Sequence, residues 1–231
     1  MSFAHRALAF YRSLSLDMPH LPDITVLNPY RHEAVLEAVQ AFLFRYYDDD
    51  NPRILIAGIN PGRFGGGLTG ISFTDPVALR EHCGIPHRLE GRRELSSEFV
   101  YRVIEAMGGP HRFFRSFFLT ALCPLGFLCR GRNYNYYDDP DLLQSVLPFI
   151  EETFRQQLLL GARTDALVVL GGGKNLQTAQ RLNEKHGWVK SLVPLDHPRF
   201  IMQYRRKQLE AYLSCYADVL SGLMETGCTT T

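Results

Sequence analysis

The chain has 231 residues, of which 45% are hydrophobic and 21% charged, a composition typical of globular proteins that bury one sizeable core. Its 25 basic and 24 acidic residues give a net charge of +1, which excludes the broad cationic field of a nucleic-acid coat protein. The five cysteines form no CxxC pair, and no apolar run approaches the roughly 18 residues of a membrane span. We therefore expect a single domain over residues 1–231, cytoplasmic and monomeric, with no membrane segment.

Helical and strand patterns alternate along the chain. Helical spacing marks residues 3–14, 32–47, 75–83, 96–107, 142–162, 176–187 and 202–220. Buried strands are predicted at residues 54–59, 116–125, 165–170 and 188–195. This alternation predicts an α/β fold, a three-layer αβα sandwich around a central, mainly parallel four-stranded sheet. Helices within residues 1–50 are expected to pack on the sheet, Pro148 to interrupt or kink its helix, and residues 225–231 to form a disordered tail.

A glycine-rich loop, "AGINPGRFGGGLTGISF" over residues 57–73, connects the first strand to a helix with Asp75 as candidate N-cap. In open α/β sheets, ligands bind outside the carboxyl ends of the strands, where such loops lie. Two polar residues follow strands at this edge: Asn60 in "GINPG" and His197 in "PLDHPRF". Taken alone, Asn60 fits a turn and His197 fits a structural loop histidine. Their shared edge makes them candidate catalytic partners.

Three ordered motifs resemble those of one enzyme family. "GINPGRFGGGLTGISF" is similar, without gaps from Asn-Pro-Gly through Thr-Gly to Phe, to the first motif of the single-strand-selective monofunctional branch of the uracil-DNA glycosylase superfamily. "LCPLGF" followed by "GRN" resembles that branch's middle segment, and "HPRF" resembles its second motif, a His-Pro that opens a DNA-wedging segment. "NYNYYDD" and "HPRFIMQYRRK" are similar to a bacterial subgroup of the branch. The resemblance implies the fold of that superfamily and hydrolysis of the N-glycosidic bond of uracil in DNA.

The resemblance also implies a role for each matching residue. An enzyme that cuts a base from deoxyribose must first extrude the nucleotide, and Phe73 would stack on the flipped base; simple core packing is the alternative. His197 would donate a hydrogen bond to the departing base oxygen, and Asn60 would orient the attacking water. Ile59 and Gly62 would line the base site. The loop glycines would let the backbone approach the base and a phosphate closely, or would form a flexible lid.

The segment after His197, "HPRFIMQYRRKQ", interleaves cations with apolar residues and contains no acid. Such a segment suits a DNA wedge, and neutralisation of phosphates would make binding salt-dependent. Taken alone, the same run fits the first turn of a helix with solvated charges. The expected DNA contacts are Arg63, Arg199, Phe200, Tyr204, Arg205, Arg206 and Lys207.

The chain departs from the branch at Ala121, where an asparagine usually precedes "LCPL" and reads the pyrimidine edge. Asn133 or Asn135 in "RNYNYY" would replace that amide, or the smaller side chain would widen the pocket toward hypoxanthine and xanthine. Both alternatives stay open from the sequence. Asp75 and Asp196, the acids close to the motifs, are interpreted as capping or orienting groups and not as a glycosidase pair.

No cofactor and no metal are expected, because the cysteines lack the set that an iron-sulfur cluster needs and no HExxH or DxDxDG pattern occurs. "VLGGGKN" lacks the GxxxxGK[ST] spacing of a phosphate loop, so its glycines fit close strand-helix packing better. Lys174 begins a helix and no motif lysine offers Schiff-base chemistry, which predicts a monofunctional glycosylase. The alternatives are a catalytically weak DNA-damage-binding module and a hydrolase of free nucleosides or nucleotides.

Overall fold

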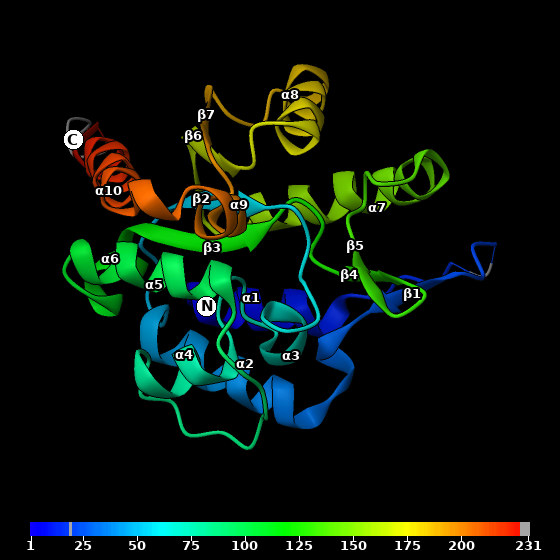
Figure 1. Cartoon of the computed structure of the whole chain (residues 1–231), viewed down its shortest axis with the longest axis horizontal. Coiled ribbons are helices and arrows are strands. Elements are labelled where there is room, and N and C mark those ends of the chain that lie inside the picture. The colour runs from blue at the N-terminus through cyan, green and yellow to red at the C-terminus, as the bar shows by residue number, and fades with distance from the viewer. Residues whose placement is uncertain (19, 227–231) are drawn as a thin grey trace.

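The central sheet has the predicted parallel arrangement (Figure 1). The computed structural model describes residues 1–18 and 20–226. Within this part of the chain, four strands follow the spatial order β3-β2-β6-β7, and every neighbouring pair is parallel. Their bounds are β2 Arg53–Gly58, β3 Phe117–Ala121, β6 Ala162–Leu170 and β7 Ser191–Leu195. Helices flank this sheet, which confirms the predicted fold class.

The composition of the strands explains their central position. The strands β2, "RILIAG", and β3, "FFLTA", are buried along their whole length, as expected for parallel strands that helices cover on both faces. In Figure 1, α2 and α4 lie below β3, whereas α10 lies to the left of β6 and β7 and α8 lies to their right. The helices are α1 Phe3–Ser13, α2 Glu33–Tyr46, α3 Gly66–Thr69, α4 Pro76–Glu81, α5 Leu95–Ala106, α6 Pro110–Ser116, α7 Pro140–Leu158, α8 Lys174–His186, α9 Pro198–Tyr204 and α10 Leu209–Thr226, with short 3-10 turns η1 Pro29–Arg31 and η2 Arg206–Gln208.

A small antiparallel sheet, which the sequence did not predict, lies toward the carboxyl end of β3 (Figure 1). Arg130 and Gly131 join two of its strands, with φ of 48° and 74°, as a two-residue hairpin turn with both residues left-handed requires. The strand over residues 132–134, "RNY", is too short and polar to give a strand pattern in the sequence. The strands are β1 Ile24–Leu27, β4 Gly126–Cys129 and β5 Arg132–Tyr134.

Arg53, the first residue of β2, attaches the N-terminal helices to the central sheet. Its side chain is fully buried, and its Nε donates to the carbonyl of Phe114 at 2.8 Å. A terminal nitrogen donates to the carboxylate of Asp49 at 2.9 Å, and the guanidinium lies 4.9 Å from the ring centre of Phe3 and 4.7 Å from that of Tyr47. A buried charge is tolerated because it is paired and hydrogen-bonded in this way.

Several predicted helix boundaries were wrong. The last expected helix, residues 202–220, is divided into α9 and α10, because Arg205 leaves helical geometry at φ −125° and ψ 19°. The helix α7 continues through Pro148, and the additional helix α6 follows Gly109. The tail expected over residues 225–231 overlaps α10, which extends through Thr226, while residues 227–231 lie outside the described residues.

Candidate active site

A pocket of about 590 Å³ opens at the carboxyl edge of the central sheet, within the size range of ligand sites. Its walls come from the ends of β2 and β3, the loop after β2, the strand β5 and the helix α9. The predicted site residues that line it are Ile59, Asn60, Gly62, Arg63, Phe73, Asn133, Asn135, His197, Arg199, Phe200 and Tyr204. The remaining three, Arg205, Arg206 and Lys207, lie outside this lining, on the exposed surface after α9.

The ring of Phe73 packs directly against Gly58, which has no side chain. A Cβ at Gly58 would lie 2.5 Å from Cζ of Phe73, which is closer than real side-chain contacts allow. Phe73 itself has a φ of 55°, an uncommon left-handed conformation for a bulky residue. The ring is half-buried, lines the pocket and has its centre 5.9 Å from that of the His197 ring. Phe73 therefore forms part of the pocket wall as well as packing against the core.

The glycine-rich loop is tightly packed, which argues against the interpretation as a flexible lid. The carbonyl of Gly62 accepts the backbone N–H of Gly67 at 2.9 Å, and α3 begins inside the loop. A Cβ at Gly67 would lie 2.5 Å from Leu27 of β1, and one at Gly126 of β4 would lie 2.4 Å from the carbonyl oxygen of Pro61. These glycines let the loop approach the small sheet, so part of their use is packing within the protein.

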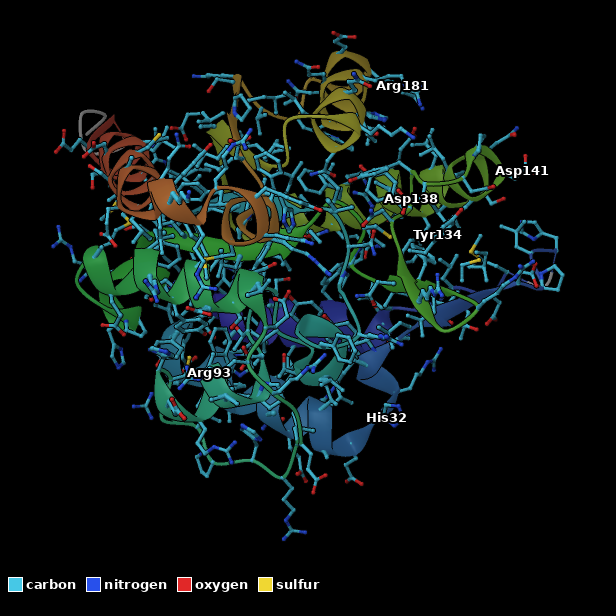
Figure 2. All side chains as sticks on the ribbon, viewed as in Figure 1. His32, Arg93, Tyr134, Asp138, Asp141 and Arg181 are labelled. Carbon is cyan, nitrogen blue, oxygen red and sulfur yellow. The ribbon has the colours of Figure 1, made fainter. Side chains whose placement is uncertain are left out.

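The side chain of Asn60 is held by the backbone at the end of β5 and just after it. Its Oδ1 accepts the N–H of Tyr136 at 3.0 Å, and its Nδ2 donates to the carbonyl of Tyr134 at 3.2 Å. Tyr134 and Asp138, labelled in Figure 2, mark this segment. An asparagine amide has two donor hydrogens and two acceptor lone pairs, so one of each stays available to the pocket. These two hydrogen bonds fix the positions of the amide oxygen and the amide nitrogen, and leave one donor and one acceptor free.

Tyr136 connects the segment that holds the Asn60 side chain to the start of α8. Its ring is fully buried, and its hydroxyl donates to Oδ1 of Asn175 at 2.8 Å. Asn175, also buried, donates through Nδ2 to the carbonyl of Leu170 at the end of β6. The position of Asn60 is thus supported from the neighbouring strand. No local pattern in the sequence indicates this support, because Tyr136 and Asn175 are far apart along the chain.

His197 is the N-cap of α9, and its Nδ1 accepts the backbone N–H of Arg199 at 3.2 Å. In a neutral imidazole, an accepting Nδ1 places the proton on Nε2. Burial, and secondly the charge of Arg199, lowers the pKa of His197 to about 4. The ring is therefore neutral near pH 7 and offers Nε2–H as a donor in the pocket that it lines.

The helix α9 exposes aromatic and cationic side chains at the mouth of the pocket. Phe200 and Tyr204 are 37% and 62% exposed, with ring centres 5.7 Å apart. The guanidinium of Arg205 lies 5.1 Å from the Phe200 ring centre. Within residues 1–18 and 20–226, no carboxylate pairs with the predicted cations of this segment, which are Arg199, Arg205, Arg206 and Lys207.

Two asparagines after β4 present opposite hydrogen-bonding groups. Oδ1 of Asn133 accepts the N–H of Arg63 at 3.0 Å, which leaves its amide nitrogen as a donor. Nδ2 of Asn135 donates to Asp138 at 3.3 Å, which leaves its amide oxygen as an acceptor. Arg63 also donates to the carbonyl of Gly131, so this predicted DNA contact is tethered to the hairpin.

Ala121 ends β3 at the pocket wall, where the sequence resemblance placed a departure. The carbonyl of Ala121 accepts a hydrogen bond from Nε2 of Gln157 at 3.3 Å, and Oγ1 of Thr120 donates to Oε1 of the same glutamine. Gln157 is fully buried on α7, behind the pocket wall. The backbone at Ala121 is thus fixed, while its small side chain leaves the wall without an amide.

Sequence reasoning missed Glu94, the one carboxylate among the described residues that line the pocket. Glu94 is the N-cap of α5 and accepts the N–H groups of Ser96 at 3.0 Å and Ser97 at 3.1 Å. Asp75 caps α4 as predicted, accepting the N–H of Ala78 at 2.8 Å, and its other oxygen accepts the N–H of Glu94. Asp196 accepts a hydrogen bond from the hydroxyl of Tyr212 of α10. All three acids serve as capping or orienting groups.

The described helices include none that is long and apolar enough to cross a membrane. Over residues 1–18 and 20–226, no group of three or more His, Cys, Asp or Glu side chains is arranged to hold a metal ion.

Comparison with known proteins agrees with this fold. Residues 44–220 match the model of the uracil DNA glycosylase superfamily. A crystal structure of wild-type SMUG2 from Pedobacter heparinus is 42% identical, with a TM-score of 0.92 over 97% of this chain and 99% of that chain. None of the curated proteins matches the chain.

The fold, the pocket and these matches define the class of protein: a monofunctional DNA glycosylase, which is a hydrolase with DNA as its partner. The chain belongs to the uracil DNA glycosylase superfamily, and within it to the bacterial SMUG-like members.

Proposed function

We propose that the protein removes uracil from DNA by flipping the nucleotide into the pocket and hydrolysing its N-glycosidic bond. The observation that carries this proposal is the pairing, in one pocket, of a clamped Asn60 amide with a neutral His197. Both groups are uncharged and fixed before substrate arrives, as electrostatic preorganisation requires.

The chemistry assigns one task to each residue. The oxygen of a water attacks C1′ as the bond from C1′ to the base nitrogen breaks, and the bonding electrons pass to the base. Asn60 holds this water through its free donor and acceptor positions, and Nε2–H of His197 donates to the base oxygen on which charge develops. The proton that the attacking water loses passes through solvent to the departing base anion, which leaves an abasic sugar and the neutral free base. Phe73 stacks on the flipped base.

We further propose that Asn133 and Asn135 read the base edge in place of the amide that Ala121 lacks. The free amide oxygen of Asn135 suits an N–H of the base, and the free amide nitrogen of Asn133 suits a carbonyl oxygen. Hypoxanthine and xanthine also present adjacent N–H and carbonyl groups, and the small Ala121 side chain leaves room for a larger ring. The proposal therefore includes deaminated purines as substrates.

The exposed cations and apolar residues of α9 and the following segment are proposed to hold the DNA and wedge it open. Arg199, Arg206 and Lys207, which have no carboxylate partners in the described chain, suit phosphates, and Phe200 and Tyr204 suit insertion beside bases.

Base release from labelled oligonucleotides that carry uracil, hypoxanthine or xanthine tests this function. Wild type should release uracil, and Asn60→Ala and His197→Ala should each lose about 10²-fold or more in single-turnover rate. His111→Ala, an exposed histidine outside the pocket, serves as the control and should behave as wild type. If wild type releases none of the three bases, or if both variants retain the full rate, the proposal is wrong. Asn135→Ala should alter the preference among the bases; an unchanged preference would exclude this residue as the reader.

A further inference from the structure

The large apolar side chains that reach the surface are concentrated around the pocket. Among the described residues, those of high exposure are Met1, Phe64, Leu95, Leu159, Phe200 and Tyr204. Three of them line the pocket, and Leu95 lies between the lining residues Glu94 and Ser96. A single exposed apolar residue needs no explanation, whereas a group around one opening marks an interaction surface.

Phe64 stands apart from the aromatic residues of α9, because it belongs to the loop after β2. The guanidinium carbon of Arg63 lies 4.5 Å from its ring centre, and that of Arg92 lies 5.0 Å away. We call these three side chains the Phe64 platform. Phe64 is 36% exposed, and Arg92 is exposed on the segment that leads into α5. The pocket is thus bordered by two separate groups that combine an aromatic ring with a guanidinium.

The charges of the Phe64 platform are available to a ligand. Arg93, labelled in Figure 2, pairs with Glu81, whereas Arg92 has no carboxylate partner within residues 1–18 and 20–226. Nε of Arg63 is buried without a hydrogen-bond partner in the described chain. The neighbouring acid, Glu94, already accepts hydrogen bonds at the start of α5. The surface is therefore aromatic and cationic.

We propose that the Phe64 platform binds an unpaired base of the substrate strand, next to the nucleotide that enters the pocket. This inference rests on the proposed function, because the platform borders the same pocket. Bases stack on aromatic rings and on guanidinium planes without regard to sequence, and cations beside such a ring attract the strand's phosphates. A base in a duplex has both faces covered by its neighbours.

If the Phe64 platform binds the neighbouring base, replacing Phe64 and removing that base should together weaken binding no more than either change does alone. The probe is a single-stranded thymidine oligonucleotide with one uridine that carries an arabino 2′-fluorine, which withdraws electrons from C1′ and resists hydrolysis. Further probes replace the nucleotide on the 5′ or the 3′ side of this uridine by an abasic tetrahydrofuran. Each probe is titrated against wild type, Phe64→Leu and Leu159→Ala; Leu159 is an exposed apolar control outside the pocket.

Phe64→Leu should weaken binding of the full probe by about tenfold, since stacking one base contributes roughly 1–3 kcal/mol. Wild type should show a similar loss with the abasic residue on one side, and Phe64→Leu should lose nothing further with that probe. The control should bind every probe as wild type does.

Equal binding of the full probe by Phe64→Leu and wild type would overturn the inference. It would also be overturned if the abasic residue weakened binding to Phe64→Leu by the same factor as binding to wild type. Such results, with uracil release by wild type intact, would leave the proposed function standing. Failure of wild type to release uracil from any oligonucleotide would instead contradict the proposed function.

Discussion

The inner wall of the pocket and the segment after β7 differ in how their side chains are held. On the inner wall, Asn60 has two backbone partners and Phe73 fits against Gly58. The segment after His197 exposes Phe200, Tyr204 and four cations without carboxylate partners in the described chain. Under the proposed function, this difference divides the labour: fixed, uncharged groups would serve the chemical step, and exposed, charged groups would capture DNA.

A substitution at Gly58 is expected to lower both stability and activity. Gly58→Ala places a Cβ 2.5 Å from the Phe73 ring, which must move. Overpacking of this kind costs about 1–3 kcal/mol of unfolding free energy. Loss of stacking on the flipped base should lower kcat/KM for uracil release by about tenfold or more. Thermal unfolding and steady-state kinetics check both effects.

Gly222→Ala is the matched control, because a Cβ at Gly222 on α10 meets nothing within 4 Å. The control should keep wild-type activity and should not lose stability, because alanine favours a helix over glycine by about 1 kcal/mol. If Gly58→Ala also keeps both, Phe73 does not depend on the space at Gly58.

A smaller effect, confined to binding, is expected from the cations after α9. The double variant Arg206→Gln with Lys207→Gln should weaken affinity for uracil DNA by about tenfold at low salt. It should also reduce the slope of log affinity against log salt by about 0.7–0.9 for each phosphate that the variant no longer neutralises. The rate at saturating DNA should stay unchanged, because these cations lie outside the pocket lining. Titrations at several salt concentrations measure the slope.

Arg155→Gln controls for the removal of a surface cation, since Arg155 already pairs with Glu152 on α7. It should leave the salt slope as in wild type. A slope in the double variant equal to that of wild type would show that Arg206 and Lys207 contact no phosphates.

The smallest effect is expected between pH 8 and pH 5.5, where an ordinary histidine would titrate near about 6.5. Because burial and Arg199 lower the pKa of His197 to about 4, its protonation state does not change over this range. The single-turnover rate should therefore show no step over this range that depends on His197. A step near pH 6.5 that disappears in His197→Gln would contradict a neutral donor.

The same shift predicts how His197 affects stability. Its folded pKa lies below the unfolded value, so the unfolded chain binds the proton first as the pH falls. The contribution of neutral His197 to stability is present above about pH 6.5 and is lost toward pH 4. The unfolding free energy of wild type should therefore fall more steeply than that of His197→Gln over this interval.

The residues that meet at the pocket were largely predictable, because strand ends of a parallel sheet share one edge. The apolar runs at residues 54–59 and 165–170 identified β2 and β6, and Asn60 and His197 both line the predicted pocket. The N-cap at Asp75 was also confirmed. In each case a local pattern carried the information.

Features that depend on contacts distant in sequence were not predictable. The partners of Asn60 come from the end of β5 and the residues after it, and β5 is too short and polar to give a periodic signal. The left-handed backbone of Phe73 and the support from Tyr136 likewise follow from packing. The break at Arg205 was missed because apolar spacing continues from α9 into α10.

A single-turnover titration of Asn60→Ala with uracil DNA tests the central claim most directly. The account predicts that the rate at saturating DNA falls by about 10²–10³-fold, as for loss of a preorganised hydrogen-bonding group. The apparent Kd should stay within about threefold of wild type, because the exposed cations that hold DNA are untouched. A variant that keeps the wild-type rate at saturation and loses only affinity would contradict the assignment of Asn60 to the chemical step.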